Sequence, residues 1–506
     1  GEIIMWPTMS RDILGLISQG AELQITSPVE KGRNFEIMPV ATSLKTKGEK
    51  LDFSPGINFK WGINSDLTLD MTVNPDFSHI EADAPKIDVN QRFALYYSEK
   101  RPFFLEGMEI FRFPEIRMVY TRRINDPIAG AKLTGKVGRF TYGVLSALDT
   151  SPTESLWDVS NGGGGKHNAL FNIFRVKADV FKESYIGFAL TDREYNGSYN
   201  RVAGLDGQFK FANKFFFKFQ AIGSKARFDG ETTSLAPGLY ADFSYSTKHF
   251  YTGFYGMAMH PDFEASSGFV NRVDYRSFGI YSGYRIYPGK KYLSQVGLRF
   301  NAGRRFGYFD DMMQDQWMRA SLQFRLTEFS QIEVEYKNQM EHYSGTDFWK
   351  NSLEVQGQLL FIKWMPFGFF FQTGDSIYYD PDDPLKGYSN IYGIGATIKP
   401  NRRLKVGVDI TKQTFWDKWG GEQVYDFNVA RTRTTYQFSK TLSVRAIVDY
   451  NHFYKQIYGS FLFSYVLRPG TVFFLGLDNN LLRGPGGTYT SDNYSIFIKF
   501  SYWLRM

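Results

Sequence analysis

The sequence predicts an all-β fold: a large transmembrane antiparallel β-barrel of about 26 strands (24-26), formed by residues 1–506 as a single unit with an internal plug. Three observations predict it. Apolar and polar residues alternate with a period of two in many segments, charged side chains stay on one face of each segment, and short and long connections follow one another. No linker rich in Gly, Ser or Pro divides the chain into domains.

The last predicted strand, residues 493–505, shows the alternation most clearly. Tyr, Ile, Ile, Phe, Tyr and Leu occupy every second position from 494 to 504, and mostly polar residues lie between them. About ten such residues suffice for a tilted strand to cross a bilayer. The same pattern predicts further strands, among them 20–26, 35–46, 52–62, 66–74, 317–326, 331–337, 403–410 and 442–450.

A soluble β-sandwich also alternates, so the connections have to distinguish the two folds. Short links are predicted at 182–183, 212–213, 247–248, 400–402, 439–440 and 468–469. Long connections are predicted at 149–169, 224–237, 259–275, 304–315, 339–349, 374–388, 412–425 and 479–492. An alternation of short and long connections is typical of an outer-membrane barrel with periplasmic turns and extracellular loops.

The composition agrees with this class and excludes others. Hydrophobic residues make up 43% and aromatic residues 18%, with 48 Phe, 32 Tyr and no Cys. The longest apolar runs, such as 367–371, fall far short of the roughly 18 residues of a membrane-spanning helix. The net charge of +7 comes from Lys and Arg scattered along strands, which argues against nucleic acid as a partner. Because residues 1–10 do not read as a signal peptide, we expect Gly1 to be a processed or truncated end.

Residues 75–115 form the longest interval without strand or helix periodicity. Prolines at Pro75, Pro85, Pro102 and Pro114 break ladders and helices, yet the interval is rich in aromatic residues that a solvated tail would not carry. We therefore predict that it is a plug inside the barrel. With both chain termini in the periplasm, counting strands back from Met506 makes the strand that ends near Asn74 run toward the periplasm and a predicted strand that starts near Ile116 run away from it. Both ends of the plug are therefore predicted at the periplasmic side.

A family resemblance appears in the same region. Asn74, Pro75, Asp76 and Phe77, the EAD of 81–83, EKRPFFLEG at 99–107 and YTRR at 120–123 resemble a Bacteroidota outer-membrane family of unknown function. Its members usually carry a carbohydrate-binding-like domain upstream, which this sequence lacks, so the resemblance suggests a fragment. The resemblance implies an outer-membrane location and no established activity.

Charged residues of the predicted plug are the first candidate site. They are Asp76, His79, Glu81, Asp83, Asp88, Glu99, Lys100, Arg101 and Glu106. His79, Glu81 and Asp83 alternate as metal ligands could, but no fourth ligand is evident, so salt bridges to lumen arginines are the favoured reading. Charges inside a packed lumen should be paired, and we predict that Arg101 and Glu106 hold the plug to the wall.

Charges on the predicted lumen face are the second candidate set: Arg299, Arg319, Arg325, Glu333, Glu335, Lys337, Arg431, Arg433 and Arg445. Cross-strand reach predicts that Arg319 and Arg325 pair with Glu333 and Glu335. The opposite face, including Phe324, Ile332, Val334, Ile496 and Phe500, is predicted to meet lipid.

No cofactor is predicted. A cluster of Asp375, Asp380, Asp382 and Asp383 could bind calcium through its oxygens, with a solvated acidic loop as the favoured reading. The six His residues show neither zinc spacing nor a nucleophile motif, so no enzyme activity is predicted.

Two functions remain open at this stage. The first is a plugged channel or transporter for an unknown bulky solute. The second is a structural or assembly subunit of an outer-membrane complex. The predicted partners are outer-membrane lipid and lipopolysaccharide, together with other envelope proteins.

Overall fold

The computed structural model describes residues 34–151, 168–228, 230–327 and 329–505, and these form one closed antiparallel β-barrel. Of its 26 strands, β10 (Glu231–Thr232) and β26 (Leu504–Arg505) have two residues each, and the other 24 make the wall. The ring is closed by β1, which pairs with β25 from Val40 opposite Ser501 to Thr46 opposite Ser495. The predicted barrel and its strand range are therefore confirmed, while the predicted strand at 20–26 lies outside the described residues.

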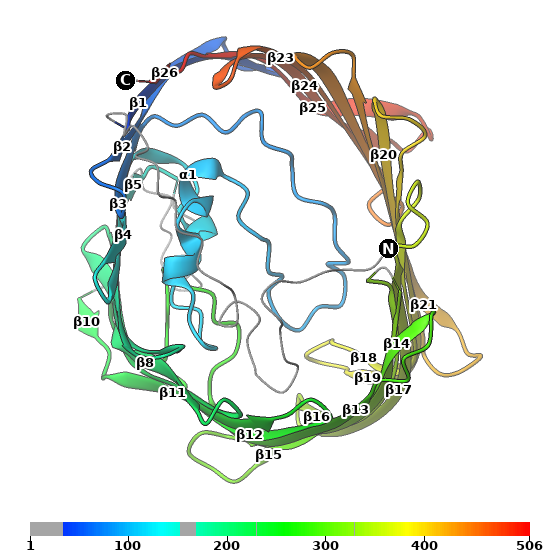
Figure 1. The fold of residues 1–506 in the computed structure, drawn as a ribbon. Helices are drawn as coiled ribbons and strands as arrows, with labels where there is room; N and C mark the ends of the chain where they lie inside the picture. The colour runs from blue at the N-terminus through cyan, green and yellow to red at the C-terminus, as the bar shows by residue number, and fades with distance from the viewer. Residues whose placement is uncertain (1–33, 152–167, 229, 328, 506) are drawn as a thin grey trace.

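The strands follow one another around the ring in chain order (Figure 1). The first nine are β1 (Phe35–Thr46), β2 (Asp52–Gly62), β3 (Leu67–Val73), β4 (Pro127–Val137), β5 (Phe140–Asp149), β6 (Ala169–Phe181), β7 (Ser184–Tyr195), β8 (Ser198–Phe211) and β9 (Phe215–Phe228). The next eight are β11 (Ala236–Ser246), β12 (Phe250–Met259), β13 (Tyr275–Ile286), β14 (Leu293–Phe306), β15 (Met313–Leu326), β16 (Gln331–Tyr343), β17 (Thr346–Leu359) and β18 (Phe367–Tyr378). The last are β19 (Leu385–Ile398), β20 (Leu404–Trp416), β21 (Gln423–Gln437), β22 (Leu442–Asn451), β23 (Gln456–Arg468), β24 (Thr471–Arg483) and β25 (Tyr489–Ser501).

Alternation along each strand separates an outer from an inner face. In β25 the outward Ile496 and Phe500 are 42% and 40% exposed, whereas the inward Phe497 and Lys499 are 3% and 4% exposed. Lys499 is buried because the chain between β3 and β4 lies against it, and the Phe497 ring lies over Gly476 of the neighbouring strand. Among the described residues, no helix is long and apolar enough to span a membrane.

The two ends of the barrel differ in their connections. At one end, which we call the terminal end, β25 ends and β1 begins, and all six predicted short links are turns between neighbouring strands. At the other, which we call the loop end, lie the longest connections, 74–126, 150–168 and 260–274. The predicted bounds 149–169 and 259–275 agree with the structure, and the other six predicted loops at this end are shorter than expected because the strands run further. The predicted loop at 339–349 is in fact a tight turn at Ser344 and Gly345, whose positive φ angles of 46° and 79° suit a two-residue hairpin.

The chain between β3 and β4, residues 74–126, is the internal segment. It runs inside the ring of strands, in blue and cyan in Figure 1, and holds the helix α1 (Pro102–Leu105) and the 3-10 helices η2 (Met108–Phe111) and η3 (Thr121–Arg123). It extends beyond the predicted end at residue 115. Both of its ends join strands at the loop end, so the predicted entry from the end that carries the C-terminus is wrong.

The direction of entry was wrong because of one miscounted strand. We predicted a strand that starts near Ile116, but residues 116–126 contain only an isolated bridge, between Arg117 and Phe269, and η3. The next strand begins at Pro127. Since neighbouring strands alternate in direction, one strand too many reverses the end at which every earlier connection lies.

Candidate functional site

The internal segment leaves the wall at a turn that Asn74 makes. Its φ of 46° lies in the left-handed region that Asn tolerates, its amide N–H donates to the carbonyl of Ile128 at 2.7 Å, and its side-chain amide donates to the carbonyl of Pro55 at 2.8 Å. The Asp76 carboxylate then accepts bonds from the Ser78 amide at 3.3 Å and hydroxyl at 2.8 Å. This turn points the chain into the lumen.

Asp76 and His79 share one buried lysine of the wall. The Lys499 ammonium lies 2.8 Å from Asp76 Oδ2 and 3.0 Å from His79 Nδ1, and it donates to the Asp76 carbonyl at 2.7 Å. Because an ammonium only donates, His79 accepts through Nδ1 and is neutral. Burial, together with the Lys499 charge, lowers the pKa of His79 to about 4. Burial opposes ionisation of Asp76, but Lys499 and Ser78 hold the pKa of that carboxyl below its ordinary value.

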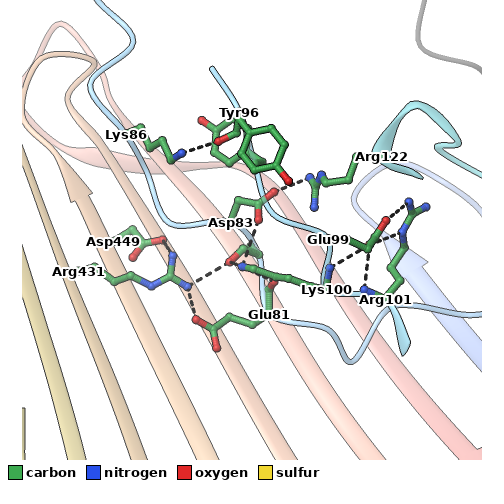
Figure 2. Close-up of polar contacts among 12 residues, drawn as sticks. Glu81, Asp83, Lys86, Tyr96, Glu99, Lys100, Arg101, Arg122, Arg431 and Asp449 are labelled. Carbon is green, nitrogen blue, oxygen red and sulfur yellow. Dashed lines mark hydrogen bonds and ion pairs between the residues drawn. The ribbon is translucent and has the colours of Figure 1, made fainter. Parts of the chain in front are cut away.

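Glu81 lies among three wall arginines, shown in part in Figure 2. Its carboxylate is 2.8 Å from Arg431, 3.1 Å from Arg433 and 3.9 Å from Arg445. Arg431 also bonds Asp449 of β22 at 3.3 Å and the Ala82 carbonyl at 3.2 Å. One carboxylate thus faces three guanidinium groups.

Asp83 and Lys100 join the two halves of the internal segment to each other. Asp83 contacts the Lys100 ammonium at 3.1 Å and Arg122 at 2.5 Å, and Lys100 also donates to the carbonyls of Glu81 and Ala82 at 3.3 and 3.0 Å (Figure 2). These bonds fold the segment back on itself rather than fixing it to the barrel.

Glu99 and Arg101 also make their contacts within the internal segment. Glu99 accepts bonds from the Arg101 guanidinium at 2.7 Å and the Thr121 hydroxyl at 2.7 Å, and Arg101 donates to the Ile124 carbonyl at 2.6 Å. Burial opposes ionisation of Glu99, but the bonds from Arg101 lower the pKa of its carboxyl overall. The prediction that Arg101 holds the segment to the wall is therefore wrong, because all of its polar partners are in the segment itself.

Glu106 does reach the wall, through an ion pair with Lys60 of β2. Beside it the buried Lys132 of β4 donates to the carbonyls of Phe103 and Glu106 at 2.5 and 2.7 Å and lies 3.5 Å from Asp70. Asp88 accepts a bond from the Tyr454 hydroxyl at 3.2 Å, at the loop between β22 and β23. The predicted plug charges therefore divide between wall contacts and contacts within the segment.

Two wall contacts were missed in the sequence. Arg92 pairs with Glu341 of β16 at 2.6 Å, and Asn90 bonds the backbone of β18 and its following loop, donating to Ile377 at 2.8 Å and accepting from Tyr379 at 2.6 Å. With the Lys499 and Arg431 contacts, these place anchor points of the segment on well-separated parts of the ring. No local sequence pattern could have identified the contacts of Arg92 and Asn90, because the two residues of each contact are some 250 or more positions apart in the chain.

Apolar contacts hold the second half of the segment. One buried cluster with residues of β5 and β6 contains Phe104, Ile110, Phe111 and Ile124, and another with β7 to β13 contains Ile116 and Met118.

The loop at residues 260–274, which the sequence presented only as long, also packs against the internal segment. Phe263 is 4% exposed, and the Tyr120 amide donates to the Ser267 carbonyl at 2.8 Å. Its Pro-Asp-Phe at 261–263 repeats that of 75–77, and each follows a strand that ends two residues earlier, at Met259 and Val73. This repeat is the feature of the sequence from which the contact of loop 260–274 with the internal segment could have been predicted.

The predicted lumen charges lie on the inner face of their strands. Arg431, Arg433 and Arg445 meet Glu81, and Glu333, Glu335 and Lys337 share the face of Glu341, which contacts Arg92. The predicted pairing on β15 and β16 is wrong, since Arg319 lies opposite Lys337 and Arg325 opposite Gln331. Glu333 instead accepts from Gln323 at 3.0 Å and lies 3.9 Å from Arg299, and Glu335 is 3.4 Å from Lys337. The residues opposite Arg319 and Arg325 must lie six positions apart in an antiparallel pair, so Glu333 and Glu335, two positions apart, cannot both lie opposite them.

The acidic cluster near residue 380 is divided by the end of β18. Asp375 lies in that strand, where it accepts from the Asn351 amide at 2.9 Å and lies 3.4 Å from Lys386. Asp380 accepts from the amides of Asp382 and Asp383 at 2.9 and 3.3 Å and so shapes the turn. In the part of the chain that the structure describes, no group of three or more His, Asp or Glu residues is placed to hold a metal ion.

Two cavities lie between the internal segment and the wall. One, of about 390 Å³, is bounded by β1 to β3, β24 and β25, and by Asp76, Phe77, His79 and Glu106. The other, of about 380 Å³, lies between Ala82, Asp83 and Pro85 and the inner face of β22 to β24. The second adjoins the arginines around Glu81, because Asp449 lines it.

A comparison with protein-family models finds a match to the first part of this chain. A domain of unknown function (DUF5916) matches residues 36–136, a range that includes the whole internal segment. No curated protein matches the chain. Solved structures with a similar chain path include the siderophore receptor PirA from Pseudomonas aeruginosa (8% identical, TM-score 0.48, 94% of this chain and 81% of that one) and the copper transporter OprC (9%, 0.48, 94% and 82%). A mutant of the ferric enterobactin receptor PfeA from Pseudomonas aeruginosa is 10% identical, with a TM-score of 0.46 over 94% and 81% of the two chains. Likenesses this remote carry no argument about function.

Proposed function

We propose that this protein is an outer-membrane channel whose lumen the internal segment closes at rest, and that it admits an unknown solute when the segment moves. The observation that carries the proposal is the ring of anchor points: the segment contacts β25, β21, β16 and β9 through Lys499, Arg431, Glu341 and Gln220. A chain tied to walls on several sides crosses the opening between them.

The outer face supports a membrane location. Outward positions such as Phe254, Ile280 and Ile394 are apolar and more than half exposed. Large exposed aromatic residues lie at both ends, with Phe309 and Trp419 at the loop end and Phe329 and Trp364 at the terminal end. Closed barrels with an apolar outer band between aromatic girdles span outer membranes, because every backbone group is paired within the ring.

The connections support an orientation. Outer-membrane barrels keep short turns in the periplasm and long loops outside. On this rule the terminal end, with Arg505 near it, faces the periplasm, in keeping with the predicted periplasmic chain ends. The internal segment is then an extracellular loop folded inward.

Conductance in planar bilayers tests the proposal. Residues 78–98 would be replaced by a short Gly-Ser bridge, which can join Phe77 to Glu99 because Arg101 contacts both, lying 5.4 Å from the Phe77 ring and bonding Glu99. The intact protein should conduct little, and the deletion should open a large and steady pore. The control is Tyr454→Phe, which removes one hydrogen bond to Asp88 and should leave the pore closed. An intact protein that already conducts freely would sink the proposal, and a deletion that stays closed would leave a structural subunit as the better account.

A further inference from the structure

We propose that the cavity between the internal segment and β22 to β24 binds an acidic, hydroxyl-rich solute, and that Glu81 occupies the place of the solute's acid group. This inference rests on the proposed channel and names the class of solute that would enter it. It is carried by two features that adjoin each other: three arginines that share one carboxylate, and a cavity whose wall side carries amide and phenol groups.

The cationic groups are Arg431, Arg433 and Arg445, which we call the arginine triad. All three reach the single carboxylate of Glu81, and among the described residues only Arg431 has a second carboxylate within ion-pair distance, that of Asp449. Arg433 remains 46% exposed in the lumen, and the buried Arg445 Nε has no partner among the described residues. Guanidinium groups present paired N–H donors that match a carboxylate, so the triad can bind more acceptor oxygens than Glu81 supplies.

The cavity adjoins the arginine triad at Asp449, which lines the cavity and pairs with Arg431. Its wall side consists of Asp449, Asn451, Gln456, Tyr458 and Asn480, and Ala82, Asp83 and Pro85 of the internal segment line the other side. Both carboxylates already have cationic partners, Asp449 in Arg431 and Asp83 in Lys100 and Arg122. Amide and phenol groups both donate to and accept from hydroxyl groups, and carboxylates accept from them. The volume of about 380 Å³ falls within the range of roughly 300–1,000 Å³ found for small-molecule sites.

Exchange of one acid for another would release the first half of the segment. Removing Glu81 alone would leave the buried Arg431 without part of its counter-charge, which is strongly unfavourable. A solute that brings its own carboxylate keeps the triad neutralised while Glu81 leaves. The structure therefore favours acid-bearing solutes over neutral ones of equal size.

Binding is measured on the purified full-length chain in detergent, by calorimetry at low salt, with trigalacturonate as the acidic probe and maltotriose as the neutral one. The native chain should bind trigalacturonate and not maltotriose. Glu81→Gln removes the internal competitor and should tighten trigalacturonate binding roughly tenfold, the size of one charge-assisted hydrogen bond. Arg433→Gln should weaken it by a similar factor. The matched control is Arg299→Gln, an arginine of β14 that is 47% exposed and lies near Glu333, which should leave the affinity unchanged.

Two results would overturn the inference. One is equal binding of the two probes by both the native chain and Glu81→Gln. The other is an Arg299→Gln chain that loses as much affinity as Arg433→Gln, since the effect would then reflect net lumen charge. If Glu81→Gln does not fold, the comparison of Arg433→Gln with Arg299→Gln still decides. Binding that is selective in a chain that never conducts would uphold the site and refute the channel.

Discussion

The two halves of the internal segment are held in different ways. Residues 75–99 meet the wall mainly through charged and polar groups, at Lys499, Arg431 and Glu341, with Ile87 and Val89 packed against one small aromatic cluster. Residues 100–126 meet it mainly through buried apolar side chains, in the two clusters around Phe104 and Met118. The first half of the internal segment is thus held to the wall mainly by polar contacts, and the second half mainly by apolar packing.

The difference has an energetic meaning. Burial of apolar area contributes about 25 cal/mol per Å² and depends little on pH or salt. A buried ion pair gains little net free energy because desolvation offsets much of the attraction, yet it is costly to break on one side only. Acid, salt or a competing ion can therefore release the first half while the second half stays docked. The three substitutions below test this division, from the largest expected effect to the smallest.

Phe104→Ala should have the largest effect, because the side chain is 1% exposed and packs in the cluster with Phe111, Leu145 and Phe171. We expect a loss of about 3–5 kcal/mol in the stability of the docked second half. Hydrogen exchange of residues 102–124 in detergent measures it. Leu105→Ala, at the neighbouring position and 47% exposed, is the control and should change little. If the two variants behaved alike, apolar packing would not be what anchors this half.

Acid should release the first half through His79. Its pKa of about 4 lies below its ordinary value of 6.5, so the docked segment binds fewer protons than the released one between these values. The stabilisation is complete above pH 6.5 and is lost as the pH falls toward 4, to the extent of roughly 3 kcal/mol. Proteolysis or hydrogen exchange of residues 75–99 across this window should rise as the pH falls.

His79→Gln should flatten that pH dependence above pH 4, where the depressed pKa of Asp76 keeps its pair with Lys499 intact. His249→Gln, which alters a histidine in the turn between β11 and β12, should not. An unchanged slope in His79→Gln would show that another group controls the release.

Arg92→Gln should have the smallest effect of the three. Glu341 keeps its bonds from Lys350 at 2.5 Å and from the Tyr379 hydroxyl at 3.1 Å, so no carboxylate is left alone. We expect a loss of about 1–2 kcal/mol, seen as faster exchange of residues 86–93. Because the lost contact is electrostatic, the gap between variant and native chain should narrow at high salt. A gap that persists at 1 M salt would point to packing of the long side chain instead.

The sequence predicted the features that neighbouring residues determine, and it missed the contacts between residues that lie far apart in the chain. Period-two alternation identified the barrel, and all six predicted short links are turns at the terminal end, because strand and turn are properties of neighbouring residues. The reach of Glu81 to a wall arginine could be anticipated from charge pairing in a closed lumen. The partners of Arg92 and Asn90, and the direction of entry at Asn74, depend on the registers and strand count of the complete ring, which one miscounted segment at 116–126 was enough to reverse.

The seam between β1 and β25 has a consequence for how the chain assembles. One edge of β1 has no hydrogen-bonding partner until residues 495–505 are available, because Val40 pairs with Ser501 and Ile37 pairs with Leu504. Contacts of such sequence separation form late and slowly, and an open edge in the meantime invites pairing with other chains. The internal segment follows the third strand and is tied to both sides of the seam, to Lys60 on β2 and Lys499 on β25. We therefore expect the segment to dock on the early strands first and to guide the last strand to the first, so that the internal segment serves as the template on which these two strands of the wall pair.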